Sequence, residues 1–244
     1  MTTLFISDLH LQPERPDVIQ AFNQFLTKIA PQASNLYILG DFFEFWIGDD
    51  FVNPLSEGIA QALNALSSSG VKIYFMAGNR DFLIGQDYLK KAGAELLEDP
   101  TVINLYGTKT LLLHGDTLCT EDKAYQAFRA QVRNPMFQQQ FLAKTVEERI
   151  AYAKQARSES AQHTQSASEY IMDVTPEEVT RQLEAHAVLQ LIHGHTHRSK
   201  IHQHPTQNGE ATRIVLGDWN TQTSYLRVDA TGYELINKPL ADGF

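Results

Sequence analysis

Short runs of mainly apolar residues recur along the chain, and a glycine or a polar residue follows each of them closely. These runs cover residues 4–6, 36–39, 71–76 and 188–192. Apolar runs of this length without polar alternation are typical of strands that are buried on both faces. They predict the parallel part of a sheet in an α/β protein.

Stretches with helical spacing lie between the first three runs. Over residues 16–30, Ile19, Phe22 and Leu26 follow the helical period. Further helices are predicted at residues 56–68 and 86–91, so strand, helix and strand alternate as in βαβ units. Shorter strand-like runs complete the pattern at residues 102–106, 110–113, 213–216, 224–228 and 233–236. The last three of these are expected to form a closing antiparallel set.

Residues 120–170 interrupt this alternation because they show helical periodicity and no strand-like run. One helical face carries the apolar residues Tyr125, Phe128 and Val132. Thr145 and Glu148 have the spacing of a capping box at the start of a further helix. We therefore expect a core made of residues 1–121 and 171–244, with a helical insertion at residues 122–170.

Composition narrows the class of protein. The single cysteine, Cys119, excludes an internal disulfide and fits a reducing compartment. No run of about 18 apolar residues occurs, so no membrane-spanning helix is expected. The net charge of −9 argues against a nucleic-acid partner, which needs a basic surface. Residues 122–170 carry a charge of +2 against −11 for the remainder, which sets the insertion apart.

Residues that can bind metal ions follow five of the predicted strands. The five blocks are Asp8-x-His10, Gly40-Asp41, Gly78-Asn79-Arg80-Asp81, His114-Gly115-Asp116 and Gly194-His195-Thr196-His197. In an open α/β sheet, ligands bind beyond the carboxyl ends of the strands, so these side chains are expected to converge. Their carboxylates, amide and imidazoles suit Mn²⁺, Fe²⁺, Co²⁺ or Zn²⁺.

These ligands are too many for one ion and suit two ions that share a bridging ligand. Asp41 is the best candidate for the bridge because a bridging group needs two oxygens and a negative charge. Two neighbouring ions can hold the attacking and leaving oxygens of a phosphoryl displacement. Arg80 adds a planar pair of donors for a phosphate oxygen. The pattern therefore predicts phosphoryl-transfer chemistry.

Each residue also has an ordinary structural explanation when it is considered alone. Asp8 could cap the helix that follows it, and Asn79 could occupy a left-handed turn. The remaining candidates are interpreted as structural or surface residues, namely His193 and Cys119 in the interior and His202 and His204 at the surface. Five such coincidences at five strand ends are harder to explain than one two-metal site.

The ordered blocks resemble the motifs of the calcineurin-like metallophosphoesterase family, and the resemblance covers most of residues 4–197. It implies an αββα sandwich of two mixed sheets flanked by helices. It also implies one metal ion bound by Asp8, His10, Asp41 and His197, and another bound by Asp41, Asn79, His114 and His195. Many relatives have a histidine where this chain has Arg80, so the acid that protonates the leaving group is not identified.

Within this family, residues 40–50, 78–83, 114–120 and 192–198 resemble the enzymes that cleave UDP-2,3-diacylglucosamine in lipid A synthesis. The resemblance implies a Mn²⁺-dependent pyrophosphohydrolase with two Mn²⁺ ions, peripheral on the cytoplasmic side of the inner membrane, with no protein partner inferred. It implies that a hydroxide bound by both ions attacks the α-phosphorus. The products would be UMP and 2,3-diacylglucosamine 1-phosphate, known as lipid X.

The same resemblance assigns roles to individual residues. Catalytic roles fall on Asp41, Asn79, Arg80 and His195, and substrate contacts fall on Asn79, Arg80, Asp122, Ser160, Thr164 and His195. Relatives often have a lysine where this chain has Ala167. One contact to phosphate or sugar is therefore expected to be absent or to come from another basic group.

The insertion is expected to be a lid that holds acyl chains and touches the membrane surface. The residues expected to line its apolar groove are Tyr125, Phe128, Phe137, Phe141 and Ile150. Arg149, Lys154 and Arg157 are expected to face anionic head groups. An insertion that packs only on itself would have no apolar groove.

Two other functions remain open. One is a different phosphodiesterase of the same fold, acting on cyclic nucleotides or as a nuclease, although the acidic charge disfavours a nuclease. The other is a non-catalytic binding module that has kept the fold and lost turnover. The intact ligands in all five blocks argue against that module.

Overall fold

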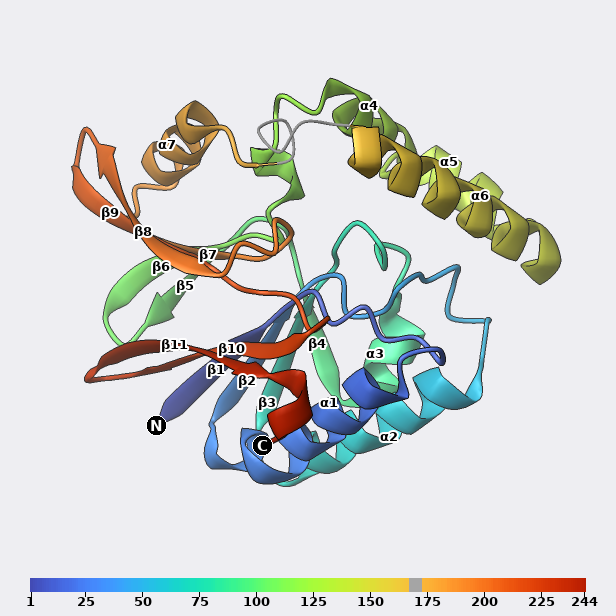
Figure 1. Ribbon diagram of the computed structural model, residues 1–244, viewed down its shortest axis with the longest axis horizontal. Coiled ribbons are helices and arrows are strands. Elements are labelled where there is room, and N and C mark those ends of the chain that lie inside the picture. Colours follow the sequence, from blue (N-terminus) through green and yellow to red (C-terminus); the bar gives the residue numbers. More distant parts are fainter. Residues whose placement is uncertain (167–172) are drawn as a thin grey trace.

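The computed structural model describes residues 1–166 and 173–244, with residues 161–166 described by their backbone alone. The strands of this described part form two mixed sheets (Figure 1). The first sheet has the order β11 (Gly232–Pro239), β10 (Gln222–Asp229), β1 (Thr2–Ile6), β2 (Asn35–Leu39), β3 (Lys72–Met76) and β4 (Ala94–Leu97). The second has the order β5 (Thr101–Leu105), β6 (Thr108–Leu112), β7 (Gln190–His193), β9 (Gly209–Val215) and β8 (Lys200–Thr206).

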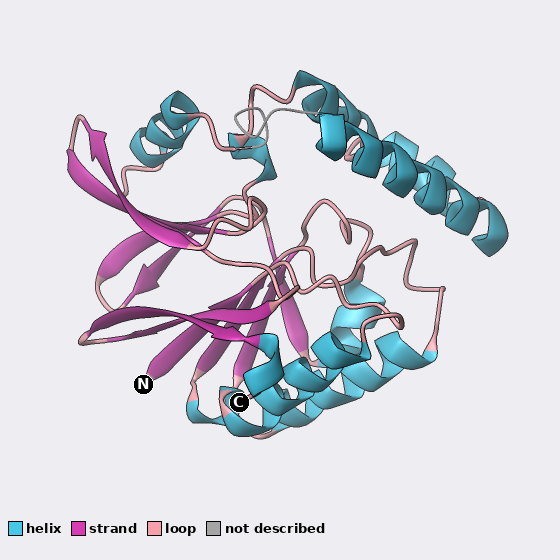
Figure 2. Cartoon of the chain, in the orientation of Figure 1, coloured by secondary structure: helices cyan, strands magenta, loops and turns pink. Residues whose placement is uncertain are grey.

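Helices cover the outer faces of both sheets (Figure 2). The helices on the first sheet are α1 (Pro16–Lys28), α2 (Pro54–Ser68) and α3 (Gln86–Ala92), and α7 (Pro176–Ala185) packs on the second. Single-turn helices occur at η1 (Ala30–Gln32), η2 (Asp116–Leu118) and η3 (Leu240–Asp242). The helices predicted from apolar periodicity around residues 16–30, 56–68 and 86–91 are all present.

Alternate residues of the central strands pack on opposite faces of the first sheet. Leu4 and Ile6 of β1 join the apolar layer under α1 and α2, whereas Phe5 between them points to the second sheet. The layer between the sheets takes side chains from both, including Tyr37, Met76, Leu112, Ile192 and Ile214. The αββα sandwich that the resemblance implied is therefore confirmed.

The strand predictions were incomplete at the sheet edges. β4 and β8 each lie at one edge of a sheet and mix exposed with half-buried residues, so no apolar run marks them. β9 was assigned to the closing antiparallel set, and this was wrong. It lies in the second sheet, parallel to β7 and antiparallel to β8, while β10 and β11 pair antiparallel in the first.

The insertion folds as three helices, α4 (Lys123–Val132), α5 (Pro135–Leu142) and α6 (Val146–Ser166), with no strand in its described part. The predicted capping box opens α6, because Thr145 N donates to Glu148 Oε2 at 2.9 Å and Glu148 N donates to Thr145 Oγ1 at 3.3 Å. These helices lie across the strand-end loops from α2 and α3 (Figure 1). No helix among the described residues is both long and apolar enough to cross a membrane.

Candidate metal centre

The loops that follow β1 and β2 continue the pairing of these parallel strands. Asp8 N donates to Gly40 O at 3.0 Å, and His10 N donates to Asp41 O at 3.0 Å. The backbones of Asp8, His10, Asp41, His195 and His197 have φ values of 56°, 50°, 50°, 67° and 59°. Left-handed backbone is unfavourable for residues with a Cβ and is concentrated at functional sites. Five predicted metal ligands therefore share an uncommon conformation.

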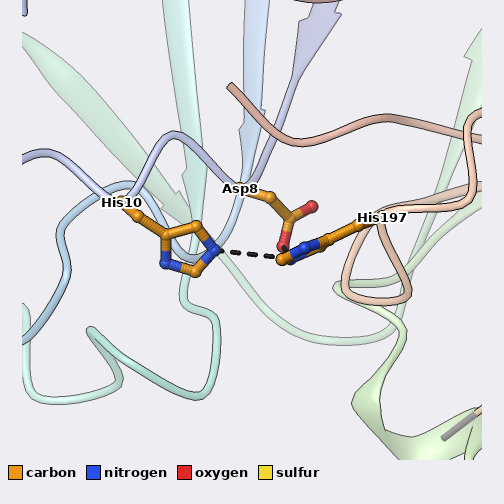
Figure 3. Close-up of side chains that lie close together, drawn as sticks. All are labelled: Asp8, His10 and His197. Carbon is orange, nitrogen blue, oxygen red and sulfur yellow. Dashed lines mark hydrogen bonds and ion pairs between the residues drawn. The ribbon is translucent and has the colours of Figure 1, made fainter. Parts of the chain in front are cut away.

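Asp8, His10 and His197 form the first ligand cluster (Figure 3). Asp8 and His10 follow β1 and His197 follows β7, so this cluster draws on both sheets. The two histidine Nε2 atoms lie 3.4 Å apart, and His197 Nε2 lies 3.3 Å from Asp8 Oδ1. Within the described chain, Asp8 Oδ1 is buried and accepts no hydrogen bond of good geometry, which suits an oxygen that binds a cation.

Asp41, His114 and His195 form the second ligand cluster. Asn79 lies among them, because its Oδ1 is 2.9 Å from both His114 Nε2 and His195 Nδ1. These four residues follow four different strands, β2, β3, β6 and β7. The convergence expected from the five sequence blocks thus occurs at one edge of the sandwich.

Asp41 lies between the two clusters. Its Oδ1 is 3.6 Å from His114 Nε2, and its Oδ2 is 4.0 Å from His10 Nε2. One carboxylate therefore presents an oxygen to each cluster, which is what a bridging ligand requires. The backbone N–H of Arg80 donates to Asp41 Oδ1 at 2.8 Å and holds the carboxylate in place.

Groups behind the ligands fix their orientation. His114 Nδ1 donates to the Leu39 carbonyl at 2.9 Å, so Nε2 faces the cluster and would be the nitrogen that binds a cation once the ring is neutral. Asp8 Oδ2 accepts from Ser7 Oγ at 2.5 Å and from His195 N at 2.9 Å, so Oδ1 alone faces the first cluster. Outer hydrogen bonds of this kind are typical of metal ligands.

Two glycines allow the loops to approach the ligands closely. A Cβ on Gly78 would lie 2.3 Å from Asp41 Oδ1, and a Cβ on Gly194 would lie 2.3 Å from Asp8 Oδ2. Both distances are shorter than any real carbon–oxygen contact, so no residue larger than glycine fits at either position without a shift.

The charges of the site favour bound cations. Burial raises the pKa of Asp8, but contact with His197 and the other nearby imidazoles holds that pKa below its ordinary value. Burial lowers the pKa of His114, yet Asp41 and neighbouring carboxylates outweigh burial and raise it to about 9. Burial and the charge of His114 lower the pKa of His195 to about 4. Buried negative charge, a carboxylate oxygen that accepts no well-aligned hydrogen bond and an N/O donor set together fit two divalent cations.

An apolar cavity of about 340 Å³ lies beside the ligand loops, between the insertion and the core. Its polar lining includes Asn79 and Arg80, and its apolar lining includes Trp46, Phe82, Leu83, Val132 and Tyr152. Four predicted groove residues line it, namely Tyr125, Phe128, Phe137 and Phe141. Ile150 is not part of the lining, so its assignment was wrong. The residues of α6 that line the cavity are Tyr152, Ala153, Ala156, Arg157, Glu159 and Ser160.

The residues predicted to contact substrate have different surroundings. Arg80 and Ser160 line the cavity, and Asn79 and His195 belong to the second cluster. Asp122 is buried, and its Oδ1 accepts the Tyr125 backbone N–H at 3.0 Å, so it caps α4. The side chain of Thr164 and the whole of Ala167 lie outside the described residues.

Two basic residues expected to face lipid head groups contact the core instead. Arg149 is only 2% exposed, and its Nη1 donates to the Ile47 carbonyl at 2.5 Å and to Asp50 Oδ1 at 2.7 Å. Arg157 forms an ion pair with Glu44. Those two predictions were wrong, because helical periodicity alone does not tell which charged residues of α6 face the core. Lys154 is exposed.

Sequence reasoning missed a buried carboxylate that joins two ligand loops. Asp81 is fully buried and accepts the backbone N–H groups of Gly78 at 2.8 Å and Phe42 at 2.7 Å. Its place in the block with Asn79 and Arg80, directly after a predicted strand, was a usable signal.

A second missed residue ties the insertion to the site. Asp116 is fully buried, and its Oδ2 accepts from Tyr125 Oη at 2.5 Å and from Arg129 Nε at 2.7 Å. Both partners belong to α4, whereas Asp116 lies two residues beyond His114. No sequence signal indicated this contact, because it depends on how the insertion docks.

The residues interpreted as structural are mostly in the interior. His193 is fully buried, its Nδ1 donates to Gly194 O at 2.8 Å, and burial lowers its pKa to about 3. Burial also raises the pKa of the Cys119 thiol to about 12. His202 and His204, which were expected at the surface, are half-buried on β8.

Comparisons with known proteins show the family of this chain. A family model described as calcineurin-like phosphoesterase matches residues 1–199. A relative from Hahella chejuensis named UDP-2,3-diacylglucosamine hydrolase is 51% identical, and the match covers 99% of each chain. A relative of the same name from Xanthomonas axonopodis pv. citri is 54% identical over 96% of this chain and 98% of its own. The solved structure of an archaeal phosphodiesterase has 12% sequence identity to this chain and a TM-score of 0.49. The match covers 97% of this chain and 99% of that one. The chain belongs to the calcineurin-like phosphoesterase family.

Proposed function

We propose that this protein hydrolyses the pyrophosphate of UDP-2,3-diacylglucosamine to UMP and 2,3-diacylglucosamine 1-phosphate. Full-length relatives that are 51% and 54% identical carry the name UDP-2,3-diacylglucosamine hydrolase. The observation that carries the proposal is the juxtaposition of two metal-ligand clusters with an apolar cavity that Asn79 and Arg80 also line. A pyrophosphate joined to a lipid needs both surroundings in one site.

The cavity suits the acyl chains of such a substrate. Aromatic side chains from α4 and α5 line one side, and Phe82 and Leu83 of the core line another. Burial of a hydrocarbon chain is favourable by about 0.8 kcal/mol for each CH₂ group. Even a partly buried chain would therefore favour the diacylated substrate over a free UDP-sugar. We accordingly assign the insertion helices α4, α5 and α6 as a lid over this cavity.

The ligand clusters would hold two Mn²⁺ ions. Asp8, His10, Asp41 and His197 would bind one ion, and Asp41, Asn79, His114 and His195 would bind the other. When bound, such ions make water more acidic and offset the charge that develops on a phosphoryl group. The guanidinium of Arg80 lies 3.7 Å from Asp41 Oδ2 and lines the cavity, where it would orient a phosphate oxygen of the substrate.

Water would displace the leaving group at the α-phosphorus, the one nearer to uridine. Hydrolysis in ¹⁸O-labelled water tests this assignment, because the label is expected in UMP. Label in the diacylglucosamine phosphate would instead mean attack at the other phosphorus.

The lid also supports a peripheral position on the cytoplasmic face of the inner membrane. The mouth of an acyl-chain site must face the lipid from which the substrate comes, and Lys144 and Lys154 are exposed on the insertion. Cationic side chains near an anionic surface contribute about 1 kcal/mol each. Sedimentation with vesicles that contain anionic lipid, at low and high salt, measures this attraction.

The decisive assay compares release of UMP from the diacylated substrate with release from UDP-glucosamine. We expect Mn²⁺-dependent turnover of the first, a much lower kcat/KM for the second, and loss of both with a chelator. Equal kcat/KM values on the two substrates would contradict the lipid assignment and favour another phosphodiesterase of this fold. Absence of turnover on any phosphodiester would favour a binding module.

A further inference from the structure

Glu44 lies between the first ligand cluster and the lid, although it belongs to neither cluster. Its Oε2 is 3.3 Å from His10 Nδ1, and its Oε1 forms the ion pair with Arg157 of α6. The side chain is 14% exposed and contributes to the cavity lining. One carboxylate thus faces a predicted metal ligand on one side and a lid helix on the other.

The backbone of the core sets the position of Glu44 beside His10. Leu11 N donates to Phe42 O at 2.9 Å, and Glu44 N donates to Leu11 O at 3.2 Å. Leu11 and Phe43 also form a parallel β-bridge. This short ladder continues the pairing of β1 with β2, so Glu44 is held beside His10 by bonds in which the insertion takes no part.

The two ring nitrogens of His10 have different surroundings. Nε2 faces the ligands, 3.4 Å from His197 Nε2 and 4.0 Å from Asp41 Oδ2. Nδ1 is buried and has no well-aligned hydrogen-bond partner in the described chain, and the Glu44 carboxylate lies next to it. A carboxylate at the outer nitrogen of a ligating histidine orients the ring and increases its strength as a ligand.

We propose that Glu44 is a positioning residue that couples helix α6 to the first metal position. Its charge is shared between His10 and Arg157, so a displacement of Arg157 changes how strongly Glu44 supports His10. A ligand in the cavity that moves α6 then alters cation affinity, and a bound cation alters the affinity of that ligand by the same factor. The inference rests on the cation binding included in the proposed function.

Calorimetric titration of the metal-free protein with Mn²⁺ tests the proposal, because it needs neither lipid nor catalytic turnover. The Glu44→Gln variant is expected to bind the ion at the first ligand cluster at least about tenfold less tightly. Arg157→Gln is expected to tighten binding by about fivefold, because the whole charge of Glu44 then serves His10. In the double variant, the Arg157 substitution is expected to have no further effect.

Asp50→Asn is the matched control. Asp50 pairs with Arg149 of the same helix α6 and belongs to neither ligand cluster, so this change loosens the helix without touching His10. We expect wild-type Mn²⁺ affinity for this variant. If Asp50→Asn weakens Mn²⁺ binding as much as Glu44→Gln does, the effect comes from lid docking and the proposal is overturned.

Two further results would overturn it, namely wild-type Mn²⁺ affinity in Glu44→Gln, or an Arg157→Gln effect that persists in the Glu44→Gln background. Circular dichroism checks the fold, and Glu44→Asp, which keeps the charge on a shorter side chain, is expected to give an intermediate affinity if Glu44→Gln does not fold. A wild-type protein that binds no Mn²⁺ contradicts the proposed function as well. Normal Mn²⁺ binding without UMP release contradicts the proposed function alone.

Discussion

Asp41 presents one carboxylate oxygen to each ligand cluster, so its removal affects both metal positions. The side chain is 2% exposed and contributes little to the apolar core. Asp41→Ala is therefore expected to fold and to lose activity and the paired binding of Mn²⁺. If it keeps more than about a tenth of wild-type kcat/KM at saturating Mn²⁺, a barrier change below about 1.4 kcal/mol, Asp41 is not the bridge.

Substitution of Gly78 is expected to change the geometry of the site. A Cβ there would lie 2.2 Å from Asp41 N and 2.3 Å from Asp41 Oδ1, so Gly78→Ala must displace the bridging residue. We expect kcat/KM to fall by at least about a hundredfold, near 2.7 kcal/mol. Gly58→Ala is the control, because Gly58 lies in α2 with nothing within 4 Å of an added Cβ. Assays of activity and thermal unfolding should show unchanged kcat/KM in the control and a stability gain of about 0.5–1 kcal/mol.

Candidate ligands could be found in the sequence because each of them directly follows an apolar strand. Glu44 and Asp116 could not be found in this way, although each lies two or three residues beyond a predicted ligand. Their partners Arg157, Tyr125 and Arg129 are distant in sequence and belong to the insertion. A residue whose role comes from docking between segments leaves no local signal.

Among the elements, α4 forms two kinds of contact with the rest of the molecule. Tyr125 and Arg129 bond to Asp116, and Arg133 Nη2 donates to the Gly78 carbonyl at 2.9 Å. Phe128 points to the cavity instead and is 37% exposed. The polar contacts fix the helix against the ligand loops, which leaves its apolar residues free to meet a ligand.

Phe128→Asp is therefore expected to weaken lipid recognition without unfolding the protein. A charge in the cavity opposes burial of acyl chains, so KM for the diacylated substrate should rise by about tenfold or more, while kcat/KM for UDP-glucosamine stays at its wild-type value. Met136→Asp is the control, because Met136 is 67% exposed and does not line the cavity. If Phe128→Asp loses activity equally on both substrates, or if Met136→Asp loses as much, the aromatic side chains that line the cavity do not select the lipid.

The two strands that the sequence did not predict share one property. β4 and β8 are edge strands, so only one neighbour pairs with each, and their outward residues are polar or partly exposed. The central strands β1, β2 and β7 were predictable because both of their faces are covered, which demands continuous apolar residues. The assignment of β9 failed for a different reason, since an apolar run does not specify which of two sheets a strand joins.

At the scale of the whole molecule, the ligand clusters join the two sheets. Asp8, His10, Asp41 and Asn79 follow strands of the first sheet, and His114, His195 and His197 follow strands of the second. Each cluster contains residues from both. Cations bound there would connect the two sheets at this edge of the sandwich. Without cations, the charge balance of the buried carboxylates and imidazoles of the site depends on protonation.

Mn²⁺ is consequently expected to stabilise the entire fold and not only the loops. A ligand that binds only the native state adds about 2.7 kcal/mol for one site at a free concentration 100 times its Kd. For a chain of this length, about 1 kcal/mol moves the unfolding midpoint by about 2–4 °C. Thermal scans by circular dichroism, with Mn²⁺ and with chelator, should therefore differ by several degrees in a single transition. Asp41→Ala should lose most of this difference because both positions lose a ligand. An equal Mn²⁺-dependent shift in Asp41→Ala would mean that the stabilising ions bind elsewhere.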